Sequence, residues 1–287
     1  MDSHKILLDK WSKDNSLLKQ KLLDKHGRAL SWVREKGKST AIGSLGALVM
    51  LASSGPKVLP VNNQTFAQAP QNIDKRAFLI SDLTSVLPKE VAQLDEKQET
   101  KVAGILSRSF NLKVAPSLEG KKLNTTYGII GAEQHLTRFP GDNTMTHFES
   151  PEEQDLYFSS GMAPGRGAWG YFANSQAEMT KIDIEREKYY IAVQTFLSED
   201  FNTRFAEYRE FYKYRKMLVV NPSNGHAIAA DIADAGPAPW TGKHLGGSPE
   251  VMKYLERVDG RQRGPVIYMF VDDPENKVPL GPIDLVK

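Results

Sequence analysis

Residues 216–233 contain the pattern that restricts the fold most: two apolar, β-rich segments separated by a turn sequence. The segments 216–220 (KMLVV) and 226–233 (HAIAADIA) flank Asn-Pro-Ser-Asn-Gly, whose Asn, Pro and Gly residues favour a tight chain reversal. We therefore predict an antiparallel hairpin. A glycine-rich loop follows, and Ser248 then begins a helix as its N-cap, because Pro occupies the next position.

Further signals predict a β-domain over residues 156–287. Residues 188–196 (KYYIAVQTF) and 266–271 are rich in β-branched and aromatic residues, as strands are. Between the predicted strands, residues 199–214 carry aromatic side chains at helical spacing, which predicts a short helix packed on the β-structure.

The order strand, N-P-x-N-G turn, strand, Asp-x-Gly-Pro, glycine-rich loop and Ser-capped helix resembles the double-psi β-barrel of the rare lipoprotein A family. Expansins and barrel-type lytic transglycosylases are more distant members of this group. The resemblance covers about residues 157–273 and is best over 219–242. It implies a mainly β fold for this domain, namely a six-stranded double-psi β-barrel. It also implies peptidoglycan glycan strands as the partner, and no cofactor.

The resemblance also assigns site residues. The acid of the family's N-D-R-G-P motif falls on Asp234, with Ala235 where arginine is usual. The family's cleft histidine falls on Gln194, and its D-L-S aspartate falls on Gly247. These two changes leave open whether the chain cleaves glycan or only binds it.

Asp234 is the candidate catalytic residue. In a lytic transglycosylase the sugar's own 6-hydroxyl attacks, so a single carboxyl can act first as acid and then as base. Burial that raises its pKa would suit that role. Two other roles remain open: Asp234 could contact glycan without catalysis, or could only cap a loop through backbone N–H groups.

Five residues are candidate glycan contacts. Trp240, with Thr241 beside it, lies on the loop after Asp234 and would either stack on a sugar face or plug the barrel end. Trp169, near Tyr171, would be a platform or a core anchor. Tyr190 and Tyr189 point to opposite faces of a strand, so we expect one of them in the core. Gln194 completes the set.

An uncharged run over residues 39–56 suggests a membrane segment. Residues 1–38 contain ten basic and five acidic residues, so this tail carries +5 and the remainder carries −3 of the overall +2. Basic charge before an apolar run of this length predicts a single-pass transmembrane helix at 39–57 with a cytoplasmic N-terminus. The alternatives are a signal peptide cleaved near Ala69 and a buried helix. The tail itself predicts a basic amphipathic helix at the membrane surface or a solvated one.

Residues 58–73 are expected to be a linker, and 74–155 a helical and irregular accessory region. The chain has no cysteine, which excludes disulfides and thiol chemistry. Its six histidines show no metal-ligand spacing, so we expect no metal. The outer part is not basic, which argues against nucleic acid. We therefore expect a membrane-anchored bacterial envelope protein that binds or cleaves peptidoglycan, or alternatively a non-catalytic envelope scaffold.

Overall fold

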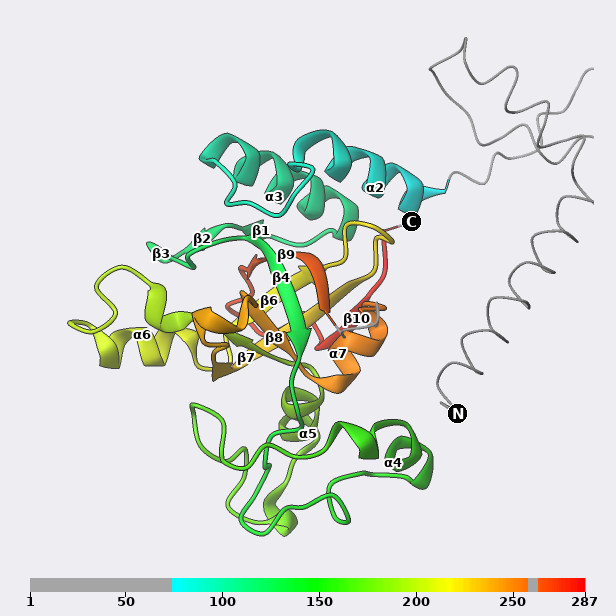
Figure 1. Ribbon diagram of the computed structural model, residues 1–287, viewed down its shortest axis with the longest axis vertical. Helices are drawn as coiled ribbons and strands as arrows, with labels where there is room; N and C mark the ends of the chain where they lie inside the picture. The colour runs from blue at the N-terminus through cyan, green and yellow to red at the C-terminus, as the bar shows by residue number, and fades with distance from the viewer. Residues whose placement is uncertain (1–73, 258–262, 287) are drawn as a thin grey trace, which may run out of the picture. The chain divides into compact units, whose positions relative to one another are not determined.

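A closed β-barrel occupies the middle of the structure, with a helical pair against one side and a loop-rich lobe against the other (Figure 1). The structure is a computed structural model that describes residues 74–257 and 263–286. The predicted tail at 1–38, the membrane segment at 39–57 and the linker at 58–73 lie outside these residues. Within the described ranges, no helix has both the length and the apolar character needed to cross a membrane.

Six strands close the barrel. They are β4 (Tyr127–Ala132), β5 (Tyr190–Val193), β6 (Lys216–Val220), β7 (Ala227–Ala235), β8 (Leu245–Gly247) and β9 (Arg263–Val271). Around the ring the order is β9-β4-β8-β5-β7-β6, and β6 closes it by pairing with β9. The pairs β4–β8 and β5–β7 are parallel and the other four pairs are antiparallel. This mixed, closed topology is compatible with the double-psi barrel expected from the sequence.

The predicted hairpin is confirmed. Strands β6 and β7 pair antiparallel from Lys216↔Asp231 to Val220↔Ala227. The turn between them is closed by hydrogen bonds from Asn221 N to His226 O and from Gly225 N to Asn221 O, both 2.9 Å. Gly225 has a φ of +71°, a left-handed conformation that glycine adopts at little cost. The local turn chemistry therefore determines the hairpin and its register.

Four short strands lie outside the ring. β1 (Val114–Ala115) extends the sheet beside β9, and β10 (Gly281–Ile283) extends it beside β7. β2 (Ser117–Leu118) and β3 (Lys121–Lys122) form a separate two-stranded ribbon.

The helices α2 (Lys75–Val86) and α3 (Glu96–Phe110) cover one side of the barrel. Asp95 and Gln98 form a capping box at the start of α3. Leu79 and Leu83 of α2 and Leu106 of α3 are fully buried in a cluster that also contains outward-facing barrel side chains. These are Leu218, Val220, Ala227, Ile267, Met269 and Val271. The helices expected in the accessory region are thus present, and they share a hydrophobic core with the barrel.

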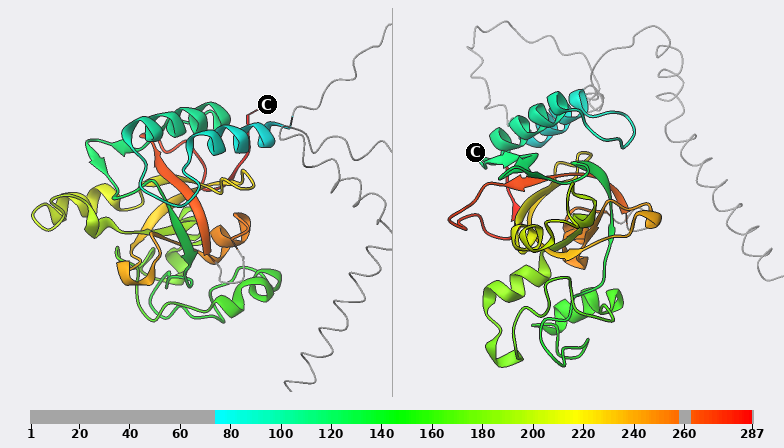
Figure 2. Two further views of the ribbon diagram at one scale, coloured as in Figure 1. Left: turned by 45° about the horizontal axis from the view of Figure 1, so that its top comes forward. Right: turned by 90° about the vertical axis from the view of Figure 1, so that its left-hand side faces the viewer.

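A lobe between β4 and β5 lies on the opposite side of the barrel from α2 and α3, as both views of Figure 2 show. It contains α4 (Pro151–Tyr157), the short 3₁₀ helices η1 (Phe158–Ser160) and η2 (Gln176–Glu178), and α5 (Lys181–Lys188). Ser150 caps α4 by accepting the N–H of Glu153, and Pro151 occupies the first turn. No individual helix was predicted from the sequence at α4 or at α5.

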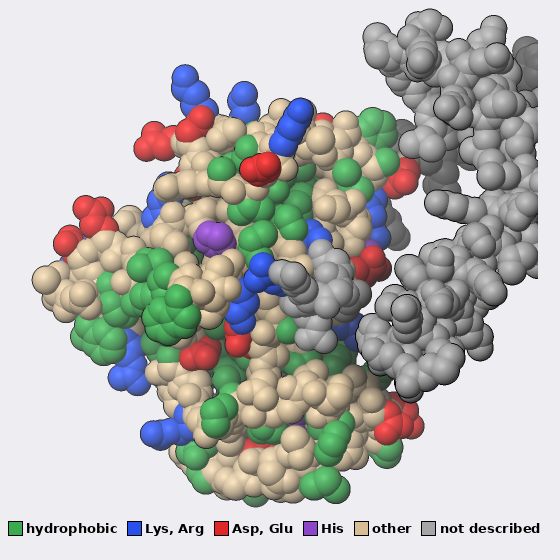
Figure 3. Space-filling model, in the orientation of Figure 1, with side chains coloured by type: hydrophobic (Ala, Val, Ile, Leu, Met, Phe, Trp, Pro, Cys, Tyr) green, Lys and Arg blue, Asp and Glu red, His purple; other side chains and the backbone are tan. Residues whose placement is uncertain are grey.

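The remaining helices are η3 (Thr195–Leu197), α6 (Phe205–Tyr212), η4 (Pro239–Thr241) and α7 (Pro249–Tyr254). The short helix predicted within 199–214 is confirmed as α6, whose Tyr208, Phe211 and Tyr212 enter the barrel core. Figure 3 shows hydrophobic side chains gathered where α6 lies, and Phe205 is exposed there. Ser248 caps α7 as predicted.

Strand β4 shows that the barrel begins before the expected domain start at residue 156. β4 belongs to the range 74–155, for which helices and irregular structure were expected. It pairs with β8 on one side and with β9 on the other, so the ring depends on it. Both partners lie more than 100 residues away in the chain, which is why no local pattern revealed the strand.

Candidate functional site

Asp234 lies near the end of β7, beside Ala192 of the parallel strand β5. Its Oδ1 atom accepts two backbone hydrogen bonds of 2.8 Å, from Ala168 N and from Ala235 N. Its Oδ2 atom makes no hydrogen bond with the described residues and is not fully enclosed by them. The carboxylate is therefore held by one oxygen, as the loop-capping role requires, while the other oxygen remains open for a ligand.

The environment of Asp234 raises the pKa of its carboxyl group. Burial raises the pKa of Asp234, although the two backbone donors work in the opposite direction, and the nearby negative charge of Glu133 raises the pKa further. No motif in the sequence singles out Glu133. The structure places it directly after β4, where its backbone N–H donates to Gly247 O and its charge acts on Asp234.

Glu133 is held by a lysine from the loop before β8. Lys243 Nζ lies 2.6 Å from Glu133 Oε1 and 3.3 Å from Ala132 O. Gly246 has no side chain at this point, and a Cβ there would lie 2.5 Å from Glu133 Oε1. Asp234, Glu133 and Lys243 thus place two carboxylates and one amine near one end of the barrel.

Trp240 extends into solvent from η4, with 89 % of its surface exposed. The sequence left a sugar platform and a barrel plug as alternatives, and this exposure excludes the plug. Thr241 beside it is also exposed, and its Oγ1 donates to Ala238 O at 2.7 Å and accepts from Lys243 N at 3.2 Å. These bonds order the loop that carries the indole.

Two of the predicted glycan contacts are buried. Gln194 donates from Nε2 to Pro237 O at 2.9 Å and to Lys243 O at 3.2 Å, and its Oε1 accepts from Asn124 at 3.0 Å. Tyr190 is fully buried and donates its hydroxyl to Gln134 O. In this structure both side chains therefore support the surrounding loops from inside and neither faces solvent.

Trp169 is a core anchor, one of its two expected roles. Its ring is half-buried against the barrel core and its Nε1 donates to Ile232 O at 2.9 Å. Tyr171, two residues later, is 37 % exposed with the Arg166 guanidinium over its ring. The anchor fixes the loop whose Ala168 N–H binds Asp234.

A cavity of about 460 Å³ lies next to Glu133. Gln134, Tyr157, Ser159, Ser160, Lys253 and Arg257 contribute to its wall. It joins Glu133, whose charge acts on Asp234, to the inserted lobe.

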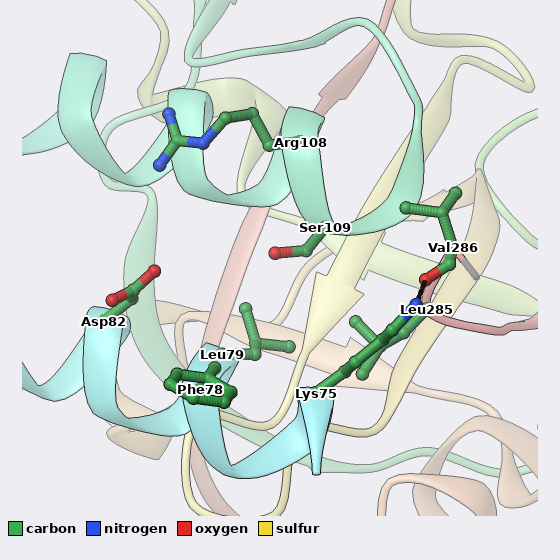
Figure 4. A pocket seen from close by; sticks show the side chains of 8 residues that line it. All are labelled: Lys75, Phe78, Leu79, Asp82, Arg108, Ser109, Leu285 and Val286. Atoms are coloured by element: carbon green, nitrogen blue, oxygen red, sulfur yellow. Dashed lines mark hydrogen bonds between the residues drawn. The ribbon is translucent and has the colours of Figure 1, made fainter. Parts of the chain in front are cut away.

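A second cavity, of about 290 Å³, lies between α2, α3 and the C-terminal segment (Figure 4). Lys75 Nζ donates to Val286 O at 2.7 Å and ties that segment to α2. Phe78 is 61 % exposed at its rim, and Leu285 packs against the core shared by the helices and the barrel. This cavity belongs to the contact between the helical pair and the chain end.

A buried cluster of histidine and carboxylate side chains lies inside the lobe. His135, His147 and Glu187 are 1 %, 3 % and 0 % exposed. His147 Nδ1 lies 2.9 Å from Asp142 Oδ2, and its Nε2 lies 3.0 Å from Glu187 Oε2. Sequence spacing could not reveal the cluster, because its members come from three separated segments.

Interactions within the cluster shift the pKa values of His147 and Glu187. Burial opposes charge on His147, but the hydrogen bonds to Asp142 and Glu187 outweigh it and raise the pKa of His147 to about 9. Burial would likewise raise the pKa of Glu187, but the adjacent histidines outweigh it and lower that pKa. His135, His147 and Glu187 offer nitrogen and carboxylate atoms that lie within 4.8 Å of one another, close enough to bind one metal ion. The expected absence of a metal rested only on sequence spacing and remains a prediction.

No known protein family, curated protein or solved structure matches this chain.

Proposed function

We propose that this chain is a bacterial envelope protein whose barrel binds peptidoglycan glycan strands at the end that carries Asp234. The observation that carries the proposal is the exposure of Trp240 on the loop that follows Asp234. An exposed indole offers a flat apolar face beside a polar N–H, and the face of a pyranose ring is a partner on which it can stack. The predicted membrane segment at 39–57 would hold the barrel at the cell surface.

The polar groups around Trp240 suit a carbohydrate. Asp234 Oδ2 is open as an acceptor, and the Glu133–Lys243 pair adds a further acceptor and donor at the same end of the barrel. Sugars are bound by a small number of oriented hydrogen bonds beside an aromatic surface, and this end of the barrel supplies both.

The test is cosedimentation of the purified full-length chain with peptidoglycan sacculi. We expect Trp240→Ala to weaken binding by about tenfold or more, since an exposed aromatic anchor contributes at least ~1.4 kcal/mol. Phe78→Ala is the matched control, because Phe78 is also exposed but lies on α2 (Figure 4). Equal binding by Trp240→Ala and the unaltered chain would refute the site, and no binding by any form would favour the envelope scaffold.

Lytic cleavage is the second candidate, and the raised pKa of Asp234 favours it. A general acid must be protonated before the reaction, and burial raises the pKa of Asp234 in that direction. Backbone donors orient Oδ1 while Oδ2 faces outward. The carboxyl would protonate the glycosidic oxygen and then accept the proton of the 6-hydroxyl as that oxygen attacks C1, which closes a 1,6-anhydro ring.

The products distinguish cleavage from binding. Cleavage predicts 1,6-anhydro-muropeptides from sacculi treated with the full-length chain. Asp234→Asn should reduce their release at least ~100-fold, because an amide cannot donate the proton. Asp155→Asn, at an exposed carboxylate on α4, should leave release unchanged. Release that persists in Asp234→Asn, or none from the unaltered chain, removes this candidate.

A further inference from the structure

The buried cluster in the lobe joins three parts of the chain. His135 follows β4, His147 lies in the loop before α4, and Glu187 belongs to α5. All three side chains are almost completely removed from solvent. Buried polar groups are normally hydrogen-bonded, because each one left without a partner costs free energy.

His135 breaks that rule. Neither of its ring nitrogens makes a hydrogen bond of good geometry with the described residues, although the ring is only 1 % exposed. The ring is held by edge contacts with Phe148 and Tyr157, at centroid distances of 5.4 and 6.1 Å. Its backbone is also fixed, because His135 N donates to Gly161 O and His135 O accepts from Ala163 N. The protein thus orients an imidazole whose Nε2 has no hydrogen-bond partner among the described residues and whose Nδ1 lies 3.4 Å from the Glu187 carboxylate.

The spacing of the donor atoms suits a metal ion. His135 Nδ1 lies 3.4 Å from Glu187 Oε1, and His147 Nε2 lies 3.0 Å from Glu187 Oε2. Two ligands bound to one tetrahedral zinc ion at its usual bond lengths lie roughly 3.3 Å apart. The distance from His135 is therefore ordinary for two ligands of one ion.

Asp142 lies where a carboxylate that hydrogen-bonds to a metal-binding histidine would lie. It accepts from His147 Nδ1 at 2.9 Å, which leaves His147 Nε2 directed at Glu187. Metal-binding histidines commonly carry such a carboxylate on the second nitrogen, because it fixes the tautomer and the ring orientation. Arg138 Nε lies 3.6 Å from the same carboxylate, so its charge is offset by Asp142.

We propose that His135, His147 and Glu187 bind one divalent transition-metal ion of the zinc class. Two imidazoles and one carboxylate favour such an ion over Mg²⁺ and Ca²⁺, which prefer oxygen ligands alone. Three protein donors leave a position for a fourth ligand such as water. The ion would link the end of β4, the loop at 141–147 and α5.

The lobe has a physical reason to contain such a link. It consists mainly of loops and short helices, and the chain has no cysteine from which a disulfide could form. A metal ion that joins three distant segments restricts the unfolded chain much as a cross-link does. The same lobe supplies Ala168, which binds Asp234.

The test uses the full-length chain, purified without a histidine tag and stripped with chelator. Co²⁺ titration should give visible d–d absorption that saturates at one equivalent, and Zn²⁺ should displace it. Zn²⁺ at about 100 times its Kd should raise Tm by roughly 5–10 °C.

His135→Phe is the decisive variant, because phenylalanine keeps the aromatic packing and removes only the donor nitrogens. It should fold and lose the Co²⁺ spectrum, with affinity at least ~100-fold weaker. Asp142→Asn should weaken binding about 10- to 100-fold. His226→Phe is the matched control, because the His226 ring stacks on Tyr254 outside the cluster.

The proposal is overturned if the stripped chain binds Co²⁺ and Zn²⁺ no more tightly than His135→Phe does, or if His226→Phe loses the spectrum equally. In either case the cluster is a hydrogen-bonded ion-pair network around His147. Because the readouts are metal binding and Tm, the result does not depend on whether the barrel binds glycan.

Discussion

Gly167 lies where any side chain would collide with the end of β7. A Cβ atom at this position would lie 2.9 Å from the carbonyl oxygen of Ala233 and 3.1 Å from Leu136 Cδ1. The β7 backbone cannot move aside as a flexible side chain can, so the loop that carries Gly167 would have to move away. The neighbouring N–H, of Ala168, would then move from Asp234 Oδ1. A single glycine therefore allows the loop to hold the candidate acid.

Gly167→Ala should lower the free energy of unfolding by about 1–3 kcal/mol, because the added methyl overpacks the contact. It should also reduce whatever glycan binding or cleavage the chain shows. Gly165→Ala is the control, since a Cβ at Gly165 meets no atom within 4 Å. Urea unfolding and sacculus cosedimentation check both variants, and equal behaviour of the two would contradict the steric argument.

At the scale of elements, Asp231 links α5 to the barrel. It lies on β7, and its Oδ2 accepts from Arg186 Nε of α5 at 3.2 Å, while Oδ1 is buried with no hydrogen-bond partner in the part of the chain that the structure describes. Burial raises the pKa of Asp231 to about 6, although Arg186 and Lys216 work against this. The folded protein therefore binds this proton more tightly than the unfolded chain does.

The resulting pH dependence has a definite sign. A raised folded-state pKa gives stability that is fully present below the unfolded pKa, near pH 4, and is lost as the pH rises through about 6. Asp231→Asn cannot ionise at this position and therefore lacks this loss. Its free energy of unfolding minus that of the unaltered chain should rise by roughly 2–3 kcal/mol between pH 4 and pH 8. Urea unfolding at both pH values measures the change. If Asp231→Asn and the unaltered chain differ in unfolding free energy by the same amount at pH 4 and pH 8, the raised pKa of Asp231 is contradicted.

At the scale of the whole molecule, α2 and α3 share a core with the outer surface of the barrel. Leu106 of α3 is fully buried in the cluster that contains Leu218 of β6 and Ile267 of β9. Helices that bury their apolar side chains against a sheet gain most of their stability from that contact. The helical pair and the barrel should therefore unfold together.

Leu106→Ala should lower the free energy of unfolding by about 2–5 kcal/mol, the usual cost of such a cavity. Far-UV circular dichroism reports the helices, and hydrogen exchange at β6 and β9 reports the barrel. The free energies of unfolding that the two signals report should fall by the same amount. A shift in the helical signal alone would show that the two parts unfold separately.

Local chemistry explains which parts of the fold were predictable. The β6–β7 hairpin and the Ser248 cap depend on neighbouring residues, so the sequence was sufficient for both. Strand β4 was missed because its segment contains two glycines and its partners, β8 and β9, are distant. Pairing on both sides makes this segment a strand, and no short-range pattern records such pairing.

The features of the candidate site likewise fall into those set by adjacent residues and those set by the tertiary structure. The sequence by itself determined that Asp234 lies at the end of the hairpin's second strand and that an aromatic loop comes after it, because these are properties of adjacent residues. Only the tertiary structure decided that Gln194 and Tyr190 are buried while Trp240 is exposed. It also decided that Glu133 approaches Asp234 and that His135, His147 and Glu187 meet. Side chains far apart in the chain become neighbours only when barrel closure and the lobe's packing bring their backbones together.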